Sequence, residues 1–173
     1  AGIPTDGDPL LIDISASITT NGMVGRHRAQ GTPLPGKWLL DNTGHVTDDP
    51  EALTSEPPGS ILPIGGVEYG HKGFALALII EALTQGLSGF GRVDRPTEWG
   101  AGVFIQVLAP AAFGGEAPFR KVMGYLASAC RQTAPQPGFD SVRMPGDRGL
   151  ALKRRALEEG LEEDLRGVLH GRE

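Results

Sequence analysis

The stretch Gly65–Gly73 contains four glycines and the cation Lys72, and it runs directly into the apolar segment Phe74–Leu83. Glycine accepts positive φ and lets a backbone approach a ligand closely, whereas the Ala- and Leu-rich segment is typical of a buried helix. We therefore expect a flexible loop at the N-terminus of a buried helix. There, free N–H groups, the helix dipole and Lys72 would bind an anion such as a phosphate. A tight turn that caps a core helix, with Lys72 in solvent, explains the same residues as well.

The standard nucleotide-binding motifs do not fit this stretch. A P-loop needs Gly-Lys followed by Ser or Thr, but Lys72 follows His71 and precedes Gly73, so the hydroxyl that would hold magnesium is missing. The dinucleotide fingerprint of three glycines directly after a strand does not fit either. The sequence has no His/Cys cluster with metal-ligand spacing and no G-x-S-x-G elbow, so we predict no metal site. A nucleotide-binding function therefore needs other support.

Two further groups of residues have the types needed for binding or catalysis. Ser15–Gly22 is small and hydroxylated and follows the apolar segment Leu10–Ile14, so its hydroxyl and N–H groups can bind a group that comes close. Ser and Thr also cap helices, which is the plainer explanation. Asp41 ends the short apolar segment Trp38–Leu40, where its carboxylate either caps a turn or faces a cleft. The turn cap is the default.

Length and composition restrict the class of protein. The 173 residues suit one domain with a sizeable core, and the formal net charge of −5 argues against a nucleic-acid binder or a cationic membrane-surface protein. No apolar run reaches the roughly 18 residues that a membrane span needs. The single cysteine, Cys130, cannot form an internal disulfide and lies in a helical apolar context. We therefore expect a core cysteine and a reducing, cytoplasmic compartment.

The segments that must position these residues alternate loosely between strand and helix patterns. Helices are predicted over Gly22–Gln30, from Gly73 to near Gly86, over Ala117–Gln132 with one apolar face, and over Ala151–Leu169 with a break at Gly160. Strands are predicted over Leu10–Ile14, Val103–Leu108 (the clearest one) and Val142–Met144, with turns over Asp41–Gly44, Thr47–Pro50 and Pro145–Gly149. These patterns indicate an α/β or α+β domain. The chain begins without methionine and enters a strand pattern almost at once, as if it started within a longer protein.

Three stretches, taken together, resemble the malate/L-lactate dehydrogenase family of the second type. They are Asp13–Ser17, then Leu34–Gly44 with Thr47–Pro50, and Leu62–Gly66 followed by Gly70–Leu76. That family also contains ureidoglycolate dehydrogenase, sulfolactate dehydrogenase, diketogulonate reductase and cyclic ketimine reductases. The late Pro145-Gly146-Asp147 is similar to the family's Pro-Gly-Glu turn, so the resemblance covers nearly the whole chain.

The resemblance implies an NAD(P)-binding α/β (α+β) fold that is not Rossmann, with a mixed sheet and helices, and homodimers whose active site lies between domains. It implies NAD or NADP as cofactor, and a small 2-oxo acid, 2-hydroxy acid or cyclic imine as substrate. Carried over by position, the cofactor site would consist of Ser15, Ala16, Ser17, Ile18, Thr19, Thr20, Asn21, Gly22, His71, Lys72, Pro145, Gly146 and Asp147. Asp41 matches an acidic position close to the substrate pocket.

Two departures from the family change what we expect of this chain. The family's chains are about twice as long, and their catalytic histidine lies in an N-terminal half with a Ser-His-Gly motif that does not occur here. His71 occupies a cofactor position and is not predicted to be the catalytic base. Residues 1–173 are therefore predicted to be the cofactor-binding portion of a longer oxidoreductase that lacks its N-terminal catalytic half, with 150–173 as a helical tail. The alternative is a non-catalytic nucleotide-binding or partner module that retains the fold.

Overall fold

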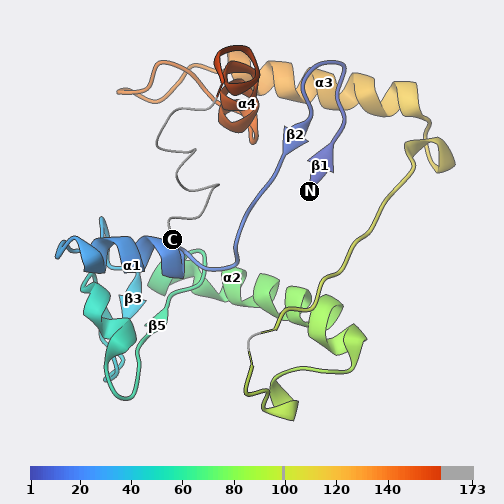
Figure 1. Cartoon of the computed structure of the whole chain (residues 1–173). Coiled ribbons are helices and arrows are strands. Elements are labelled where there is room, and N and C mark those ends of the chain that lie inside the picture. Colours follow the sequence, from blue (N-terminus) through green and yellow to red (C-terminus); the bar gives the residue numbers. More distant parts are fainter. Residues whose placement is uncertain (99, 161–173) are drawn as a thin grey trace. The chain divides into compact units, whose positions relative to one another are not determined.

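The structure of the chain is a computed structural model that describes residues 1–98 and 100–160 (Figure 1). It divides into two compact units. The central unit is Ile14–Gln106, and the terminal unit combines Ala1–Asp13 with the chain from Val107 onward. In the described residues no helix is both long enough and apolar enough to cross a membrane. The same residues contain no group of three His, Cys, Asp or Glu side chains that could hold a metal ion.

The central unit is built around a small antiparallel sheet and the helix α1 (Asn21–Ala29). The sheet has the order β4 (Val46–Thr47), β3 (Leu39–Leu40), β5 (Ser60–Ile61), with Leu39 opposite Thr47 on one side and Ile61 on the other. A 3-10 turn, η1 (Pro50–Thr54), begins after the Asp49 cap, whose carboxylate accepts from the Glu51 amide. The apolar core consists of Val24, Leu34, Leu39 and Ala52, and Leu39 is fully buried.

The glycine stretch is helical, so the predicted loop is wrong. Helix α2 runs over Gly66–Glu81, with a kink at Tyr69, where the dihedrals are not helical. It continues through a π-helical turn, η2 (Ala82–Gly86), and the chain leaves the helix near Gly89, as predicted. A glycine costs a helix only about 1 kcal/mol relative to alanine. Tertiary contacts of that magnitude are therefore enough to keep a glycine-rich stretch helical against its local preference for a loop.

Helix α2 is also not buried by the described residues, contrary to the prediction. Its buried residues are Gly70 and Gly73, whereas its large apolar side chains Phe74, Leu78, Ile79 and Ile80 are exposed. The sequence pattern therefore specifies an apolar surface correctly, but the described residues do not cover it.

The terminal unit pairs a short hairpin with two helices. Strands β1 (Gly2–Ile3) and β2 (Leu10–Leu11) are antiparallel, so the strand predicted over Leu10–Ile14 shortens to two residues. Helix α3 (Glu116–Gln132) confirms the predicted helix to within one residue. Helix α4 (Asp147–Glu159) ends at Gly160, as predicted, but begins before the predicted start at Ala151, so the predicted turn over Pro145–Gly149 is wrong beyond Gly146. Cys130 on α3 is half-buried rather than a core residue. Residues 161–169 of the predicted tail lie outside the described part of the chain.

Two predicted strands do not form. Val142–Met144 has no regular structure; the amide of Met144 bonds instead to the carboxylate of Asp147 at the start of α4. Val103–Leu108, the clearest strand of the sequence, has no strand partner among the described residues. A strand needs a neighbour to receive its backbone hydrogen bonds, so a strong local pattern is not enough.

Candidate functional site

Two segments of the predicted cofactor site meet in the central unit through backbone contacts. The amide of Ile18 donates to the carbonyl of Leu62 (2.9 Å), and the amide of Ile64 donates to the carbonyl of Ala16 (2.8 Å). Between these two bonds, Ser17 forms an antiparallel bridge with Pro63. The hydroxylated stretch Ser15–Gly22 is therefore held along the residues that lead into α2.

Two glycines let α2 approach this pair of segments. A Cβ atom at Gly70 would lie 3.0 Å from Cγ of Pro63, and one at Gly73 would overlap the backbone of Ile64 and lie 3.0 Å from the carbonyl oxygen of Ala16. The amide of Gly73 donates to the carbonyl of Ile64 (3.2 Å). Since only glycine has no Cβ, these positions use it for close backbone packing. The expectation that glycines permit a close approach is correct, but the group that approaches here is the chain itself.

The hydroxyls of Ser15 and Ser17 are bonded within the stretch Ser15–Gly22. Ser15 Oγ donates to the carbonyl of Ser17 (2.9 Å), and Ser17 Oγ donates to that of Thr19 (2.7 Å). Thr20 is the N-cap of α1 and its Oγ1 accepts from the amide of Met23 (3.1 Å), which is the capping role weighed from the sequence.

The first two residues of α1, Asn21 and Gly22, retain unpaired backbone amides. Among the described residues these two N–H groups meet no hydrogen-bond acceptor. They lie at the positive end of α1, where an anion is stabilised. This is the part of the predicted cofactor site whose chemistry best suits a phosphate.

His71 and Lys72 lie on α2, directly after the kink and next to Gly73. Both side chains are exposed, and Nζ of Lys72 lies 5.2 Å from the centre of the Tyr69 ring. The contact of Gly73 with Ala16 joins the backbone that carries His71 and Lys72 to the hydroxylated stretch. The structure therefore brings these two groups of predicted residues into one unit, from positions about fifty residues apart in the sequence.

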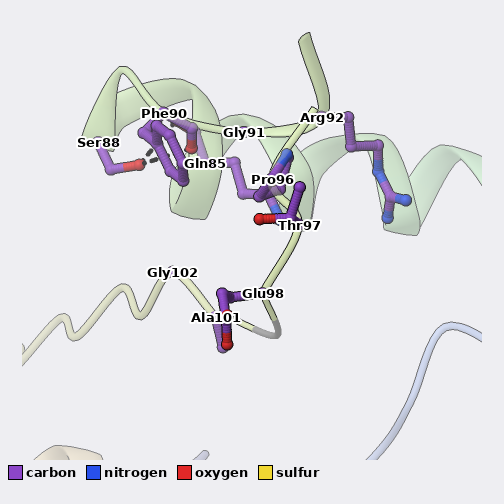
Figure 2. A pocket seen from close by; sticks show the side chains of 11 residues that line it. Gln85, Ser88, Phe90, Gly91, Arg92, Pro96, Thr97, Glu98, Ala101 and Gly102 are labelled. Atoms are coloured by element: carbon purple, nitrogen blue, oxygen red, sulfur yellow. Dashed lines mark hydrogen bonds between the residues drawn. The ribbon is translucent and has the colours of Figure 1, made fainter. Parts of the chain in front are cut away.

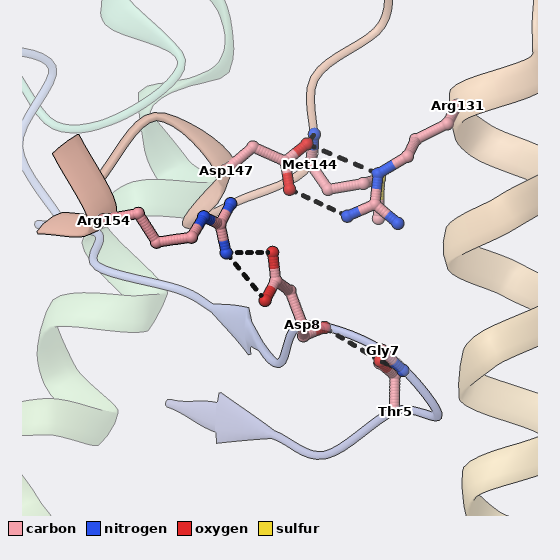
Figure 3. A network of polar contacts seen from close by, with 7 residues as sticks. All are labelled: Thr5, Gly7, Asp8, Arg131, Met144, Asp147 and Arg154. Atoms are coloured by element: carbon pink, nitrogen blue, oxygen red, sulfur yellow. Dashed lines mark hydrogen bonds and ion pairs between the residues drawn. The ribbon is translucent and has the colours of Figure 1, made fainter. Parts of the chain in front are cut away.

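Pro145, Gly146 and Asp147 belong to the terminal unit, where they contact β2 and α3. Figure 3 shows Asp147 with Arg131 of α3. The carbonyl of Pro145 accepts from the amide of Leu11 (3.0 Å), and a Cβ atom at Gly146, whose φ is +97°, would lie 2.9 Å from Cβ of Leu11. The carboxylate of Asp147 accepts from the amide of Met144 (2.8 Å) and from the guanidinium of Arg131 (2.8 Å).

The ion pair of Arg131 with Asp147 determines the charge state of this turn. The Arg131 guanidinium, followed by the Met144 amide, holds the pKa of the Asp147 carboxyl below its ordinary value. Asp147 in turn raises the pKa of Arg131. A second ion pair, with Nη1 of Arg154 at 2.9 and 3.0 Å from the two carboxylate oxygens of Asp8, joins α4 to the hairpin (Figure 3). The Pro-Gly-Asp turn is thus held by an ion pair to α3 and a backbone hydrogen bond to β2.

Asp41 lies in the turn between β3 and β4. Its Oδ1 accepts from the Thr43 hydroxyl (2.7 Å) and from the amides of Thr43 (2.8 Å) and His45 (2.9 Å). These bonds, the hydroxyl first, lower the pKa of the Asp41 carboxyl. The geometry is that of the turn cap, and a role near the substrate stays a prediction.

His45 is a residue that the sequence reasoning missed. Its Nδ1 lies 2.8 Å from the Thr43 hydroxyl. Because that hydroxyl already donates to Asp41, it accepts from an Nδ1–H of His45. The signal in the sequence was the Asp-x-Thr-x-His spacing around a glycine turn, in which three polar side chains share one side of a hairpin.

A cavity of about 960 Å³ lies elsewhere in the central unit and includes none of the predicted site residues (Figure 2). Its wall consists of Gln85, Ser88, Phe90, Gly91, Arg92, Pro96, Thr97, Glu98, Gly100, Ala101 and Gly102. The Oε1 atom of Gln85 is buried without a hydrogen-bond partner in the described chain, and Ser88 Oγ donates to the carbonyl of Phe90 (3.2 Å).

Comparison with known proteins gives the family. The family model described as malate/L-lactate dehydrogenase matches residues 1–166. The chain is 33% identical to a (2R)-3-sulfolactate dehydrogenase (NADP(+)) of Chromohalobacter salexigens, over 92% of this chain and 47% of that protein. It is 30% identical to a Delta(1)-pyrroline-2-carboxylate reductase of Pseudomonas fluorescens, over 94% of this chain and 49% of the relative.

Solved structures give the same fold. A delta1-piperideine-2-carboxylate reductase of Pseudomonas syringae superposes with a TM-score of 0.70 at 27% identity, over 93% of this chain and 47% of that one. A malate dehydrogenase of Entamoeba histolytica superposes with a TM-score of 0.74 at 22% identity, over 89% and 46%, which bears on the fold alone. The mixed helices and small sheets are those of an α/β fold.

The chain spans about half the length of the curated relatives it matches. Within that half, the match runs through both segments of the cofactor site predicted in the central unit and through the Pro145–Asp147 turn. The chain belongs to the malate/L-lactate dehydrogenase family.

Proposed function

We propose that this chain is the cofactor-binding portion of an NAD(P)-dependent oxidoreductase that interconverts a 2-hydroxy acid and a 2-oxo acid, or reduces a cyclic imine. Relatives bear the names L-lactate dehydrogenase, (2R)-3-sulfolactate dehydrogenase (NADP(+)), ureidoglycolate dehydrogenase (NAD(+)) and Delta(1)-pyrroline-2-carboxylate reductase. The observation that carries the proposal is the packing of Gly73 against Ile64 and Ala16, which holds the hydroxylated stretch beside the helix of His71 and Lys72.

The residues of the central unit suit the phosphates of such a cofactor. The unpaired amides of Asn21 and Gly22 provide two donors at the positive end of α1, and Lys72 provides an exposed cation. When bound, a nicotinamide supplies the hydride of the reaction. The role of these residues is to bind and orient the cofactor. A contact of Pro145–Asp147 with the cofactor stays a prediction from the resemblance to the family.

The proton of the reaction comes, in this proposal, from a histidine outside this chain. The Ser-His-Gly motif of the family's N-terminal half does not occur here. Such a histidine must reach the substrate oxygen or nitrogen to act as a general acid. Asp41, ionised in its turn, would orient that histidine and stabilise its protonated form. The complete protein is proposed to be a homodimer, a state that the uncovered apolar side of α2 would suit.

Complementation tests this function. The chain is combined with the missing half, as a longer protein or by co-expression, and oxidation of NADH and NADPH is followed with pyruvate, oxaloacetate and a cyclic ketimine. Turnover of one of these classes is expected. A complete, folded protein that is inert towards a broad panel of such acids would refute the enzymatic proposal, whereas cofactor binding without turnover would favour the non-catalytic module.

A further inference from the structure

A second cavity, of about 320 Å³, lies within the terminal unit, between the loop that joins β1 to β2 and one side of α3. Its wall includes Thr5, Asp6, Gly124, Ala127, Ser128 and Arg131. All of these residues belong to one compact unit, so the cavity does not depend on where the central unit lies. Its volume is at the lower end of the range for small-molecule sites.

Hydrogen bonds hold the loop of this cavity beside α3. Nη1 of Arg120, on α3, donates to the carbonyl of Thr5 (3.0 Å). The Thr5 side chain is buried, and its hydroxyl donates to the carbonyl of Asp8 (2.8 Å) and accepts from the amide of Gly7 (3.0 Å). Figure 3 shows the loop with Thr5 and Gly7 next to α3. The loop side of the cavity is therefore a defined structure.

The wall of the cavity carries two opposite charges that do not pair with each other. The carboxylate of Asp6 lies over Gly124, where an added Cβ atom would be 3.0 Å from Oδ2 of Asp6. Arg131 follows two helical turns later, about 10 Å further along the axis of α3. Among the described residues no ion pair joins Asp6 to Arg131, and the Asp6 carboxylate meets no hydrogen-bond donor. The space between the two charges is open to a ligand.

Two side chains of α3 keep donors for the carboxylate of such a ligand. Arg131 donates to Asp147 through Nε (3.4 Å) and Nη2 (2.8 Å), and the other three N–H groups of its guanidinium meet no acceptor in the described chain. The hydroxyl of Ser128 accepts from Nε2 of Gln132 (3.0 Å), while its own O–H meets no acceptor there. Ser128 and Arg131 are three residues apart and therefore neighbours on one side of the helix.

We propose that this cavity binds a small zwitterion of the α-amino-acid class, with its ammonium group on Asp6 and its carboxylate on Arg131 and the Ser128 hydroxyl. A simple anion is repelled by Asp6 and a simple cation by Arg131, whereas a zwitterion meets an opposite charge at each end. Gly124 and the buried Ala127 give the wall an apolar part that suits a short aliphatic side chain. The cavity includes none of the residues predicted to bind the cofactor, so the inference goes beyond the proposed function.

Saturation-transfer NMR on the 173-residue chain tests the proposal with L-valine and its two single-charge analogues. Isobutylamine lacks the carboxylate of valine, and 3-methylbutanoate lacks its ammonium group. We expect L-valine to bind with a dissociation constant of about 1 mM, and each analogue to bind at least about 10-fold more weakly. The same titration on the complete protein covers the case in which the chain does not fold alone.

Two results of this titration would overturn the proposal. One is that L-valine does not bind. The other is that an analogue binds as tightly as L-valine, because one charge of the cavity would then suffice.

A matched set of substitutions locates the binding. Asp6→Asn removes the charge at a side chain without a bond in the described chain, and should weaken L-valine binding about 3- to 10-fold with stability unchanged. Asp140→Asn changes another exposed carboxylate of the terminal unit, outside the cavity, and should have no effect. Asp147→Asn removes the charge that competes for Arg131, and should strengthen L-valine binding about 3-fold or more.

The substitutions can also contradict the assignment. Equal effects of Asp6→Asn and Asp140→Asn would show that L-valine binds outside this cavity. Unchanged or weaker binding in Asp147→Asn would show that Arg131 does not hold the carboxylate. Either result would overturn the proposed site.

Discussion

Substitution of Gly73 by alanine tests the packing that joins the two segments of the candidate cofactor site. Gly73 is buried, and an added Cβ atom would overlap the backbone of Ile64 and lie 3.0 Å from the carbonyl oxygen of Ala16. Backbone atoms cannot rotate away as a side chain does. The methyl group must therefore push α2 from the segment that carries Ser15–Gly22.

The magnitude follows from three contributions. Overpacking of a tight contact costs about 1–3 kcal/mol, and weakening of the Gly73–Ile64 hydrogen bond costs about 1 kcal/mol more. Alanine in place of glycine gains about 1 kcal/mol within a helix. We therefore expect the free energy of unfolding to fall by about 1–3 kcal/mol, together with weaker binding of NADH or NADPH by the assembled protein.

Urea unfolding followed by tryptophan fluorescence measures this change, because Trp38 packs against the core of the central unit. Gly25→Ala is the matched control: Gly25 is also helical, on α1, but a Cβ atom there meets nothing within 4 Å. That control should be unchanged or more stable by up to about 1 kcal/mol. If Gly73→Ala is as stable as Gly25→Ala, the close packing of α2 against Ile64 and Ala16 is not what requires a glycine.

Three further substitutions test the charged residues. Lys72→Ala in the complete protein should weaken NADH or NADPH binding about 10- to 100-fold, as expected for the loss of one charge-assisted hydrogen bond. Unchanged affinity for both cofactors in a calorimetric titration would mean that Lys72 is only a solvent-exposed residue beside Tyr69. Asp41→Asn keeps an acceptor oxygen for Thr43 and His45 but removes the charge. The complete enzyme should therefore turn over more slowly and lose its activity at a lower alkaline pH, with its stability little changed. Lost stability with an unaltered pH profile would mean that Asp41 only caps its turn. Because Arg131 lowers the pKa of Asp147, the stabilisation by Asp147 is present above the ordinary carboxyl pKa of about 3.9 and is lost as the pH falls through the lower folded value. Asp147→Asn should therefore lower the free energy of unfolding by about 1 kcal/mol at pH 7 and by progressively less below pH 4; urea unfolding at both pH values measures this, and a difference that does not depend on pH would contradict it.

The sequence determined the features whose causes are local. Helix α3 follows from its apolar periodicity, and α1 begins after the Thr20 cap. The helical stretch that starts with α2 stops near Gly89 because glycine ends helices. The turns at Asp41 and at Pro145–Gly146 follow from side-chain and backbone preferences within a few residues. The resemblance of short motifs was enough to indicate the family.

Tertiary structure decided the features that depend on residues far apart in the chain. Pro63, Ile64 and Ala16 leave no room for a Cβ atom at Gly70 or Gly73, so only glycine lets α2 pack this closely. The contacts made by this packing outweigh the weak local preference of glycine for a loop. The bridge of Ser17 with Pro63, which assembles the candidate site, leaves no periodic signal in either segment. Val103–Leu108 has the composition of a strand but forms none within the described chain, because hydrogen bonding along a strand requires a second strand and no local preference can supply one.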